Sequence, residues 1–467
     1  MDRDDARGSG RGCGLRRVGV ALGLGLLTIT CGTGEPPLAA LDELRLPSGA
    51  LLTPDGGWLF VTNSNLDREE ESSALVVLDV ARLEQAIAKA DGDALPTAER
   101  PCRQGVDHVE CAARFFLDPE RSRRLPSGAG NIALDRPFGE AGPLRLMIPS
   151  RLDPSVTWLD VDVGTDGPAI DCGEDGERRC DDAHTLRRFK NNPSGNLMPS
   201  EPARLVVGAP GTRYALLPQL LGQGLSVIAL DGPEGPALIN TDGDFFLEDP
   251  YVDGRFGGFS VAQRGCDPGA PVTGSQDCAW PYFYATHRYQ PAIGALALDN
   301  FGFVRSLGNY GLLDLNVYSV QDRPFTGDLA FEDSAAQERL LVVHTTPPGL
   351  ARVDTRLGAD MRPRNEVTHS VSLCRNPNVL AIDRPLDREP TAYVSCFGDD
   401  QVAAVALAAF VVVATIPVGD GPNELVIDPG RRWLYVVNTP EESISIVELD
   451  HSSPQRHTEI ARIGRYE

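Results

Sequence analysis

Near the C-terminus of the chain, short runs of mostly apolar residues, rich in β-branched and aromatic side chains, are separated by turn residues. One such stretch begins at Asn378, and a second begins at Glu424 with a closely similar order of apolar positions. Alternating β-branched and aromatic residues suit a pleated strand packed on both of its faces, and Asp-Pro-Gly and Asn-Thr-Pro supply turns between the strands. Each stretch therefore reads as four short strands, and the pattern restarts after about 42 residues.

A four-stranded unit of this length cannot bury both of its faces alone, so successive units are expected to stack into a closed ring. We therefore predict an all-β fold, a seven-bladed β-propeller of four-stranded antiparallel blades with loop and short helical insertions. Six or eight blades remain open alternatives, because residues 240–310 lack clean periodicity. The expected second strands of the seven blades are marked by Phe60, Leu146, Leu216, Tyr284, Val342, Tyr393 and Tyr435.

Three segments carry a resemblance to a known family of repeats. Leu59–Asn63 reads LFVTN, Leu434–Asn438 reads LYVVN, and Ala414–Gly419 reads ATIPVG between two blades. These segments resemble the YVTN family of propeller repeats. The likeness covers residues 412–449 closely, residues 46–80 moderately, and the middle third only in outline. It implies a β-propeller of the bacterial lipoprotein type.

Two insertions and the ring closure give further expectations. Asp79 is expected to cap a helix over residues 80–90, with the outer strand of the first blade resuming at residues 108–117. The last blade carries four strands of its own, so we expect 458–463 to pair with 444–449. Residues 41–46 should then add outside that pair or cross the junction. The uncharged run from Val402 to Val418 aligns with two strands of the next repeat, which favours strands over a membrane-spanning helix.

The N-terminus predicts export. Arg16 and Arg17 precede an apolar run over residues 18–30, which is too short to span a bilayer and fits a secretory signal. Residues 26–32 resemble a bacterial lipobox in which Cys31 is lipidated, although Thr28 and Thr30 depart from its usual residues. We expect a signal peptide at 1–30, a lipidated tether at 31–45 and the propeller at 46–467. Since Gly32 rather than Asp follows Cys31, an outer-membrane lipoprotein is expected, facing either the periplasm or the medium. An ordinary signal cut nearby is the alternative.

The remaining cysteines fall into neighbouring pairs, as exported proteins that form local disulfides often show. Zinc is the competing interpretation, with Cys172, Cys180 and His184, or Cys102, His108 and Cys111, as ligands. No CxxC occurs, and these spacings are loose for zinc, so we favour disulfides and no metal. The predicted pairs are Cys102 with Cys111, Cys172 with Cys180, Cys266 with Cys278, and Cys374 with Cys396.

Charge and motifs exclude several function classes. The formal net charge of −23 disfavours nucleic acid and anionic lipid surfaces as partners. No GxSxG, CxxCH or phosphate-binding glycine loop occurs, and no cofactor is expected. Asn240, Asp242 and Asp244 imitate half of a calcium loop, but Phe245 and Tyr251 stand where that loop needs Gly and Glu. A solvated acidic turn is the simpler interpretation.

Propeller geometry suggests one candidate site. The innermost strand of each blade lines the channel, and the loop leading into it borders one mouth. The third residues of these loops are expected to be Gly49, Gly128, Arg204, Asp328, Val379 and Glu424. Arg204, Asp328 and Glu424 would then form a binding site at the channel mouth, unless they are turn residues that satisfy one another or water.

Two function classes follow. The first is a non-enzymatic envelope lipoprotein, anchored to the membrane by its lipid, that binds a protein, a glycan or a small molecule. The second is a lactonase-like hydrolase that uses channel carboxylates, a histidine or a bound metal. The first is preferred, because no residue of a catalytic motif matches a position in this chain.

Overall fold

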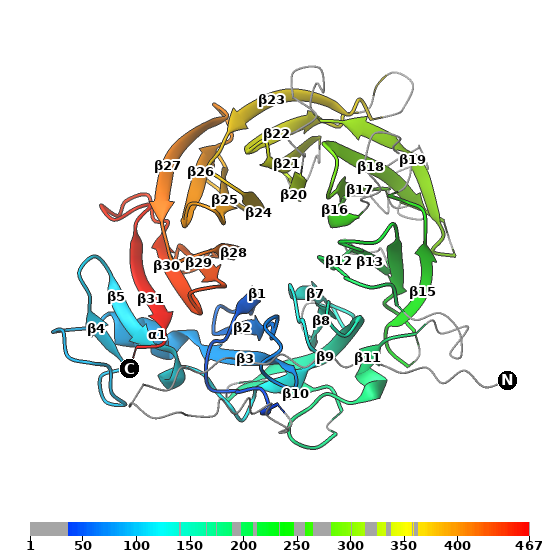
Figure 1. Ribbon diagram of the computed structural model, residues 1–467. Helices are drawn as coiled ribbons and strands as arrows, with labels where there is room; N and C mark the ends of the chain where they lie inside the picture. Colours follow the sequence, from blue (N-terminus) through cyan, green and yellow to red (C-terminus); the bar gives the residue numbers. More distant parts are fainter. Residues whose placement is uncertain are drawn as a thin grey trace, which may run out of the picture.

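The chain folds into a seven-bladed β-propeller, as predicted (Figure 1). The computed structural model describes residues 36–466 apart from 140–141, 165, 174, 189–197, 209–212, 233, 247–256, 265–281, 300, 313–324, 333–337, 357 and 359–362. The predicted signal peptide, Cys31 and the Cys266–Cys278 pair lie outside the described residues.

Each blade is an antiparallel sheet whose strands run outward from the channel in chain order, with two additions described below. The first three blades are β1 (Pro47–Leu52), β2 (Trp58–Asn63), β3 (Ser73–Asp79) and β6 (Arg123–Leu125); β7 (Ala133–Asp135), β8 (Leu144–Ser150), β9 (Ser155–Gly164) and β10 (Gly167–Asp171); and β12 (Val206–Val207), β13 (Tyr214–Pro218), β14 (Leu225–Ala229) and β15 (Ala237–Asp242).

The other four blades follow the same plan. They are β16 (Gly258–Gln263), β17 (Tyr282–His287), β18 (Ala292–Leu298) and β19 (Val304–Gly311); β20 (Phe325–Phe331), β21 (Arg339–Thr346), β22 (Gly349–Asp354) and β23 (Glu366–Ser372); β24 (Pro377–Asp383), β25 (Thr391–Cys396), β26 (Gln401–Ala406) and β27 (Val411–Pro417); and β28 (Pro422–Asp428), β29 (Trp433–Asn438), β30 (Ser443–Glu448) and β31 (Glu459–Gly464). All seven predicted markers lie in second strands.

The core consists of buried layers between neighbouring blades. Successive strand residues point to opposite faces, and both faces of a blade are covered. In β29, Leu434 and Val436 pack toward blade 6, whereas Tyr435 and Val437 pack toward blade 1. This double burial explains why the second strands read as nearly continuous apolar runs. The uncharged run 402–418 forms β26, a turn and β27, so the preference for strands is confirmed.

The first insertion forms a short helix and a hairpin. The helix α1 (Val80–Ile87) begins where predicted, with the Asp79 side chain accepting a hydrogen bond from the Arg82 amide at 2.9 Å. It ends at Ile87, before the expected residue 90. The chain continues through β4 (Cys102–Gln104), β5 (Val109–Ala112) and the 3-10 helix η1 (Ala113–Phe115). No helix in the described part of the chain is long and apolar enough to cross a membrane.

The outer strand of blade 1 corrects one prediction. The strand that pairs with β3 is β6 at residues 123–125. The predicted segment 108–117 reaches β3 at its end, where Leu117 forms an isolated antiparallel bridge with Leu78. Of that segment, residues 109–112 form β5, which instead pairs in parallel with β31 of blade 7. Sequence periodicity identifies a strand but carries no information about which sheet edge it joins.

Ring closure follows one of the two predicted arrangements. The strand β31 pairs with β30, as expected. Residues 41–46 do not add outside it, because the β5–β4 hairpin occupies that edge. They cross the junction between blades 1 and 7, where Leu41 and Leu44 are buried in the shared core. The Asn63 Nδ2 amide donates to the Glu43 carbonyl oxygen at 2.9 Å, which holds this segment in place.

Three of the predicted disulfides are present. The Cα atoms of Cys102 and Cys111 are 4.1 Å apart, those of Cys172 and Cys180 are 5.1 Å apart, and those of Cys374 and Cys396 are 5.7 Å apart. The first distance falls just short of the expected range of about 4.4–6.8 Å. These pairings exclude the two zinc sites that were the competing interpretation.

Two further short elements belong to blade 2. The 3-10 helix η2 (Asp182–His184) leads into β11 (Thr185–Leu186), which pairs with β9. The His184 Nδ1 atom lies 2.7 Å from Asp181 Oδ1, and the His184 ring packs against Trp158. His184 therefore has a structural role at the edge of this blade.

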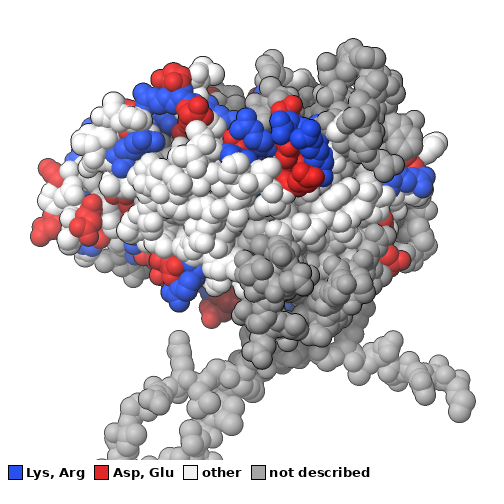
Figure 2. Space-filling view, turned by 90° about the horizontal axis from the view of Figure 1, so that it is seen from above, with Lys and Arg blue, Asp and Glu red and all other residues white. Residues whose placement is uncertain are grey.

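The outer edges of the blades differ in how they are covered. Blade 7 is capped by the β5–β4 hairpin, whereas β27 of blade 6 exposes Val411, Val412 and Val413 at 47%, 38% and 51%. Figure 2 looks onto the edge of the ring that faces upward in Figure 1, and a largely uncharged band crosses its visible surface below a charged margin. The ring thus covers one outer edge strand and leaves another open.

Candidate functional site at the channel mouth

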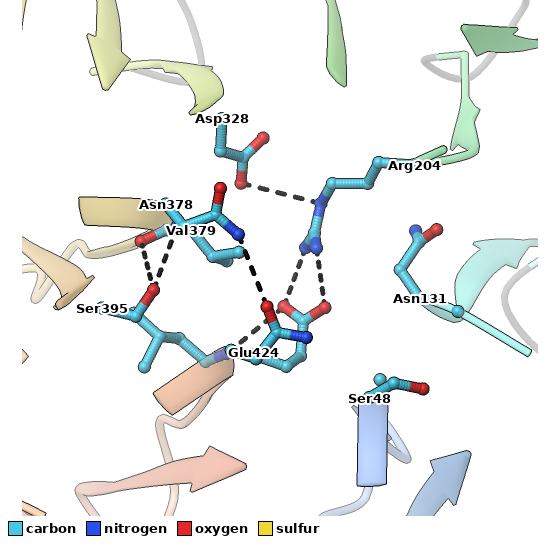
Figure 3. A network of polar contacts seen from close by, with 12 residues as sticks. Ser48, Asn131, Arg204, Asp328, Asn378, Val379, Ser395 and Glu424 are labelled. Atoms are coloured by element: carbon cyan, nitrogen blue, oxygen red, sulfur yellow. Dashed lines mark hydrogen bonds and ion pairs between the residues drawn. The ribbon is translucent and has the colours of Figure 1, made fainter. Parts of the chain in front are cut away.

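One residue from each blade stands at an equivalent position where the innermost strand begins. Aligning the pairing of each innermost strand with its second strand gives Gly49, Asn131, Arg204, Ser260, Asp328, Val379 and Glu424. In five blades the pairing register shifts at this point. Such a bulge leaves a residue outside the ladder and re-aims its side chain. The side chains of four of these residues, Arg204, Asp328, Val379 and Glu424, lie around one opening (Figure 3).

The alignment corrects the prediction for blade 2. The equivalent residue is Asn131, not Gly128, because the innermost strand of blade 2 begins late. Gly128 lies in the preceding turn with a φ of 86°, and a Cβ there would be 2.4 Å from the Leu152 nitrogen. The Asn131 side chain donates to the Leu205 carbonyl and accepts from the Leu205 amide. The sequence pattern missed both Asn131 and Ser260. In blades 2 and 4 no proline stands two residues before the equivalent position, although one does in most of the other blades.

Arg204, Asp328 and Glu424 are brought together, as predicted. Nη1 and Nη2 of Arg204 lie 2.7 and 2.8 Å from the two Glu424 oxygens, and its Nε lies 3.6 Å from Asp328 Oδ2. Arg204 belongs to blade 3 and Glu424 to blade 7, so this contact crosses the channel (Figures 1 and 3). A two-pronged contact between guanidinium and carboxylate is strong and geometrically specific. The three side chains form a cross-brace at the mouth.

The two carboxylates are buried and fully engaged. Glu424 is 3% exposed and Asp328 is 5% exposed. Asp328 also accepts hydrogen bonds from the amides of Leu329 and Leu380, and Glu424 accepts one from the amide of Leu425. Burial alone would lower the pKa of Arg204, but the Glu424 and Asp328 carboxylates outweigh burial and raise it. Arg204 therefore keeps its charge, and each carboxylate is already occupied by donors, so the three side chains satisfy one another.

The rim around the cross-brace is neutral. The residues just before the equivalent positions include Ser48, Phe259, Gly327, Asn378 and Asn423. Asn378 Nδ2 lies 3.4 Å from Asn423 Oδ1, and the Ser48 hydroxyl donates to the Ala129 carbonyl at 2.7 Å. Neighbouring blades approach closely here, since a Cβ on Gly327 would be 2.4 Å from the Asn378 carbonyl oxygen. The rim offers amides and hydroxyls rather than charges.

Groups that could hold a metal ion are absent from the described residues. Asp242 Oδ1 accepts a hydrogen bond from the Asp244 amide at 3.1 Å, which fits the acidic turn favoured above. Of the described histidines, His344 is buried in β21, where burial lowers its pKa to about 4, so it is neutral at physiological pH.

A surface cleft of about 720 Å³ lies away from this mouth, between the turns of blades 6 and 7. Arg432 and Asp383 in its wall form a bidentate pair at 2.9 and 2.5 Å. A second cleft of about 710 Å³, lined by loops of blades 1 and 2, holds the pairs Arg179–Glu71 and Arg187–Asp153. In both clefts the charged side chains named here are already paired with opposite charges.

No family model matches this chain, and none of the curated proteins matches it. Solved structures that are similar include hydrazine synthase from Kuenenia stuttgartiensis, 13% identical, covering 89% of this chain and 98% of that one with a TM-score of 0.48. A protein from Lactobacillus plantarum is 12% identical over 84% and 94% of the two chains, with a TM-score of 0.49.

A candidate 6-phosphogluconolactonase from Bacteroides uniformis is also similar. It is 11% identical over 81% of this chain and 87% of that one, with a TM-score of 0.47. At these identities and scores, none of the three assigns a function to this chain.

Proposed function

We propose that this protein is an exported, lipid-anchored binding protein whose propeller engages a protein, a glycan or a small molecule without catalysing a reaction on it. One observation carries the proposal. The two carboxylates at the channel mouth are occupied by Arg204 and by backbone amides, so neither is free to act as a general base or to ligate a metal. The neutral rim of Asn378, Asn423 and Ser48 suits recognition by hydrogen bonds.

Binding and catalysis are separated by an experiment on the native protein. The full chain is purified from the cell envelope in detergent, bound partners are identified by mass spectrometry, and the same sample is assayed against a panel of sugar lactones. We expect a reproducible partner or ligand and no lactone hydrolysis. Hydrolysis that is lost in Asp328→Asn and retained in the exposed-site variant Arg388→Met would overturn the proposal in favour of the lactonase-like hydrolase.

The anchor is tested separately. We expect the wild-type protein to incorporate a palmitate analogue and to fractionate with the outer membrane, and Cys31→Ala to do neither. Cys13→Ala is the matched control, because Cys13 belongs to the predicted signal peptide that is removed. Absence of label from both the wild type and Cys31→Ala would refute lipid anchoring and leave the binding role standing.

A further inference from the structure

Arg288 is a half-buried cation at the channel mouth. It follows β17 in blade 4, its amide donates to the Gly257 carbonyl, and its own carbonyl accepts from the Thr326 amide of blade 5 at 3.1 Å. Its side chain reaches over blade 5 as far as Asn378 of blade 6, one of the rim residues defined above.

The hydrogen-bond partners of the Arg288 guanidinium are all neutral. Nη1 lies 2.7 Å from the Thr326 carbonyl oxygen, 3.2 Å from Asn378 Oδ1 and 3.4 Å from Thr345 Oγ1. These contacts all use Nη1, and no contact from Nε or Nη2 to the described residues is found. Since a guanidinium carries five N–H donors in a rigid fork, the Nε–Nη2 edge is the part that remains for a ligand.

Aromatic rings hold this guanidinium in place. Its central carbon lies 4.9 Å from the centre of the Phe259 ring and 5.7 Å from that of the Phe325 ring. Tyr289 packs edge-on against Phe325 at 5.5 Å. Cation–π contacts of this kind stabilise an arginine but supply no negative charge.

No carboxylate compensates Arg288 among the described residues. Burial lowers the pKa of Arg288 to about 10; neighbouring Tyr289 raises it, and Arg151, itself 2.7 Å from Glu201, lowers it. By contrast, Arg204 in the same mouth has two carboxylates. A half-buried cation with only neutral partners is costly unless an anion completes its surroundings.

We infer that Arg288 is the anchor of an oxyanion-binding site at the channel mouth, which takes a carboxylate or phosphate group of a small ligand. The Nε–Nη2 edge binds two oxygens of the anion in a fork, and the Phe259 and Phe325 rings flank it. The carboxylates of Asp328 and Glu424 leave the nearby cross-brace with a net charge of −1, so a singly charged anion is favoured over a doubly charged one. This inference rests on the proposed binding function and names the class of its ligand.

The test uses the full chain in detergent, with inorganic phosphate and benzoate as probes in isothermal titration and thermal-shift measurements at constant ionic strength. We expect saturable binding of at least one probe, weakened about tenfold or more by Arg288→Met, since one charge-assisted fork is worth that much. Arg288→Lys keeps the charge but loses the fork, and should bind weakly while remaining folded.

The control variant is Arg375→Met. Arg375 precedes β24, is 75% exposed in its side chain and is paired with Asp399, so its loss should leave binding unchanged. Saturation by benzoate alone identifies a carboxylate ligand, and saturation by phosphate alone identifies a phosphate ligand.

Absence of saturable binding of either probe to the wild type overturns the inference. Equal binding of a probe to the wild type and to folded Arg288→Lys and Arg288→Met also overturns it. So does a titration or thermal-shift signal with chloride that equals the signal with phosphate or benzoate. These failures leave the proposed function intact, because that function is tested separately, by partner identification and by lactone hydrolysis that depends on Asp328.

Discussion

At the scale of single residues, one arginine at the channel mouth neutralises part of the charge of two buried carboxylates and holds them in place. Glu424 and Asp328 come from blades 7 and 5, and Arg204 from blade 3 holds both. Without that arginine, two buried carboxylates would face each other across the channel and would have to bind protons or a cation. With it, they become part of the structure of the ring.

Arg204→Met should destabilise the protein strongly. Removing one partner of a buried ion pair leaves uncompensated charge and costs about 3–5 kcal/mol. The triple variant Arg204→Met, Asp328→Asn, Glu424→Gln should recover much of this loss, because it removes the charges together. Arg388→Met is the control, as the exposed pair Arg388–Asp387 should change the free energy of unfolding by no more than about 0.5 kcal/mol. Urea unfolding measures all three; a loss for Arg204→Met similar to that of Arg388→Met would contradict the cross-brace.

His344 should make stability depend on pH. Its pKa falls from an unfolded value of about 6.5 to about 4 because it is buried, so the unfolded state binds more protons between these values. Stability is therefore full above pH 6.5 and decreases as the pH falls toward 4. Between pH 7 and pH 5 this one group should account for about 2 kcal/mol.

The pH dependence is checked by urea unfolding at both pH values. His344→Leu should lower the loss between pH 7 and pH 5 by about that amount, because leucine does not titrate. The exposed His451 gives the control variant, His451→Ala, which should keep the wild-type slope. An unchanged slope in His344→Leu would rule out His344 as the source.

At the scale of elements, the β4–β5 hairpin is a cap on blade 7. Its strand β5 lies in parallel beside β31, and the Cys102–Cys111 disulfide joins its two strands. An open outer edge strand invites pairing with another chain, and this hairpin removes that opportunity at blade 7. The corresponding edge of blade 6, β27, has no such cover among the described residues.

Replacing Cys102 and Cys111 by alanine should loosen this cap. In the chain-entropy model a loop of this size contributes about 2.5–3 kcal/mol. Hydrogen exchange should show faster exchange of the amides of β5 and β31, with β28 and β29 little affected. The matched control is the Cys172→Ala, Cys180→Ala variant, whose loop is of similar length in blade 2 and should leave β31 protected. Equal effects of the two variants on β31 would contradict the capping role.

At the scale of the whole molecule, every hydrophobic cluster found among the described residues is shared by two neighbouring blades. The cluster between blades 1 and 7 adds Leu41, Leu44 and Leu83 from the segments around the junction. Because a closed ring has no free end, losing one blade exposes the faces of both its neighbours. The ring should therefore unfold as one unit rather than blade by blade.

A single cooperative transition is the expected outcome of denaturant unfolding. Of the four tryptophans, Trp58, Trp158 and Trp433 report on blades 1, 2 and 7, and Trp280 lies outside the described residues. Trp280→Phe serves as the background for the fluorescence measurement, and far-UV circular dichroism reports on all strands. Coincident transitions by fluorescence and circular dichroism are the mark of cooperative unfolding. A fluorescence transition clearly ahead of the loss of strand signal would show that the junction opens first and that the ring is not one unit.

The sequence by itself determined the strands and therefore the blades. Apolar runs rich in β-branched and aromatic residues, turn residues and the repeat placed the seven second strands, from Phe60 to Tyr435. The spacing of neighbouring cysteines placed three disulfides. These features depend on local chain geometry. It also placed Arg204, Asp328 and Glu424 at one mouth, since equivalent positions of a repeat must meet in a ring.

Only the tertiary structure decided which partners distant segments take. Local periodicity does not say that β5 leaves blade 1 for blade 7, that Asn131 rather than Gly128 faces the channel, or that residues 41–46 cross the junction. Nor does it show that Arg204 is matched by two carboxylates while Arg288 has none. Those outcomes depend on how far side chains extend and on which sheet edges meet when the ring closes. Both involve segments that are far apart in the sequence, so local patterns do not predict them.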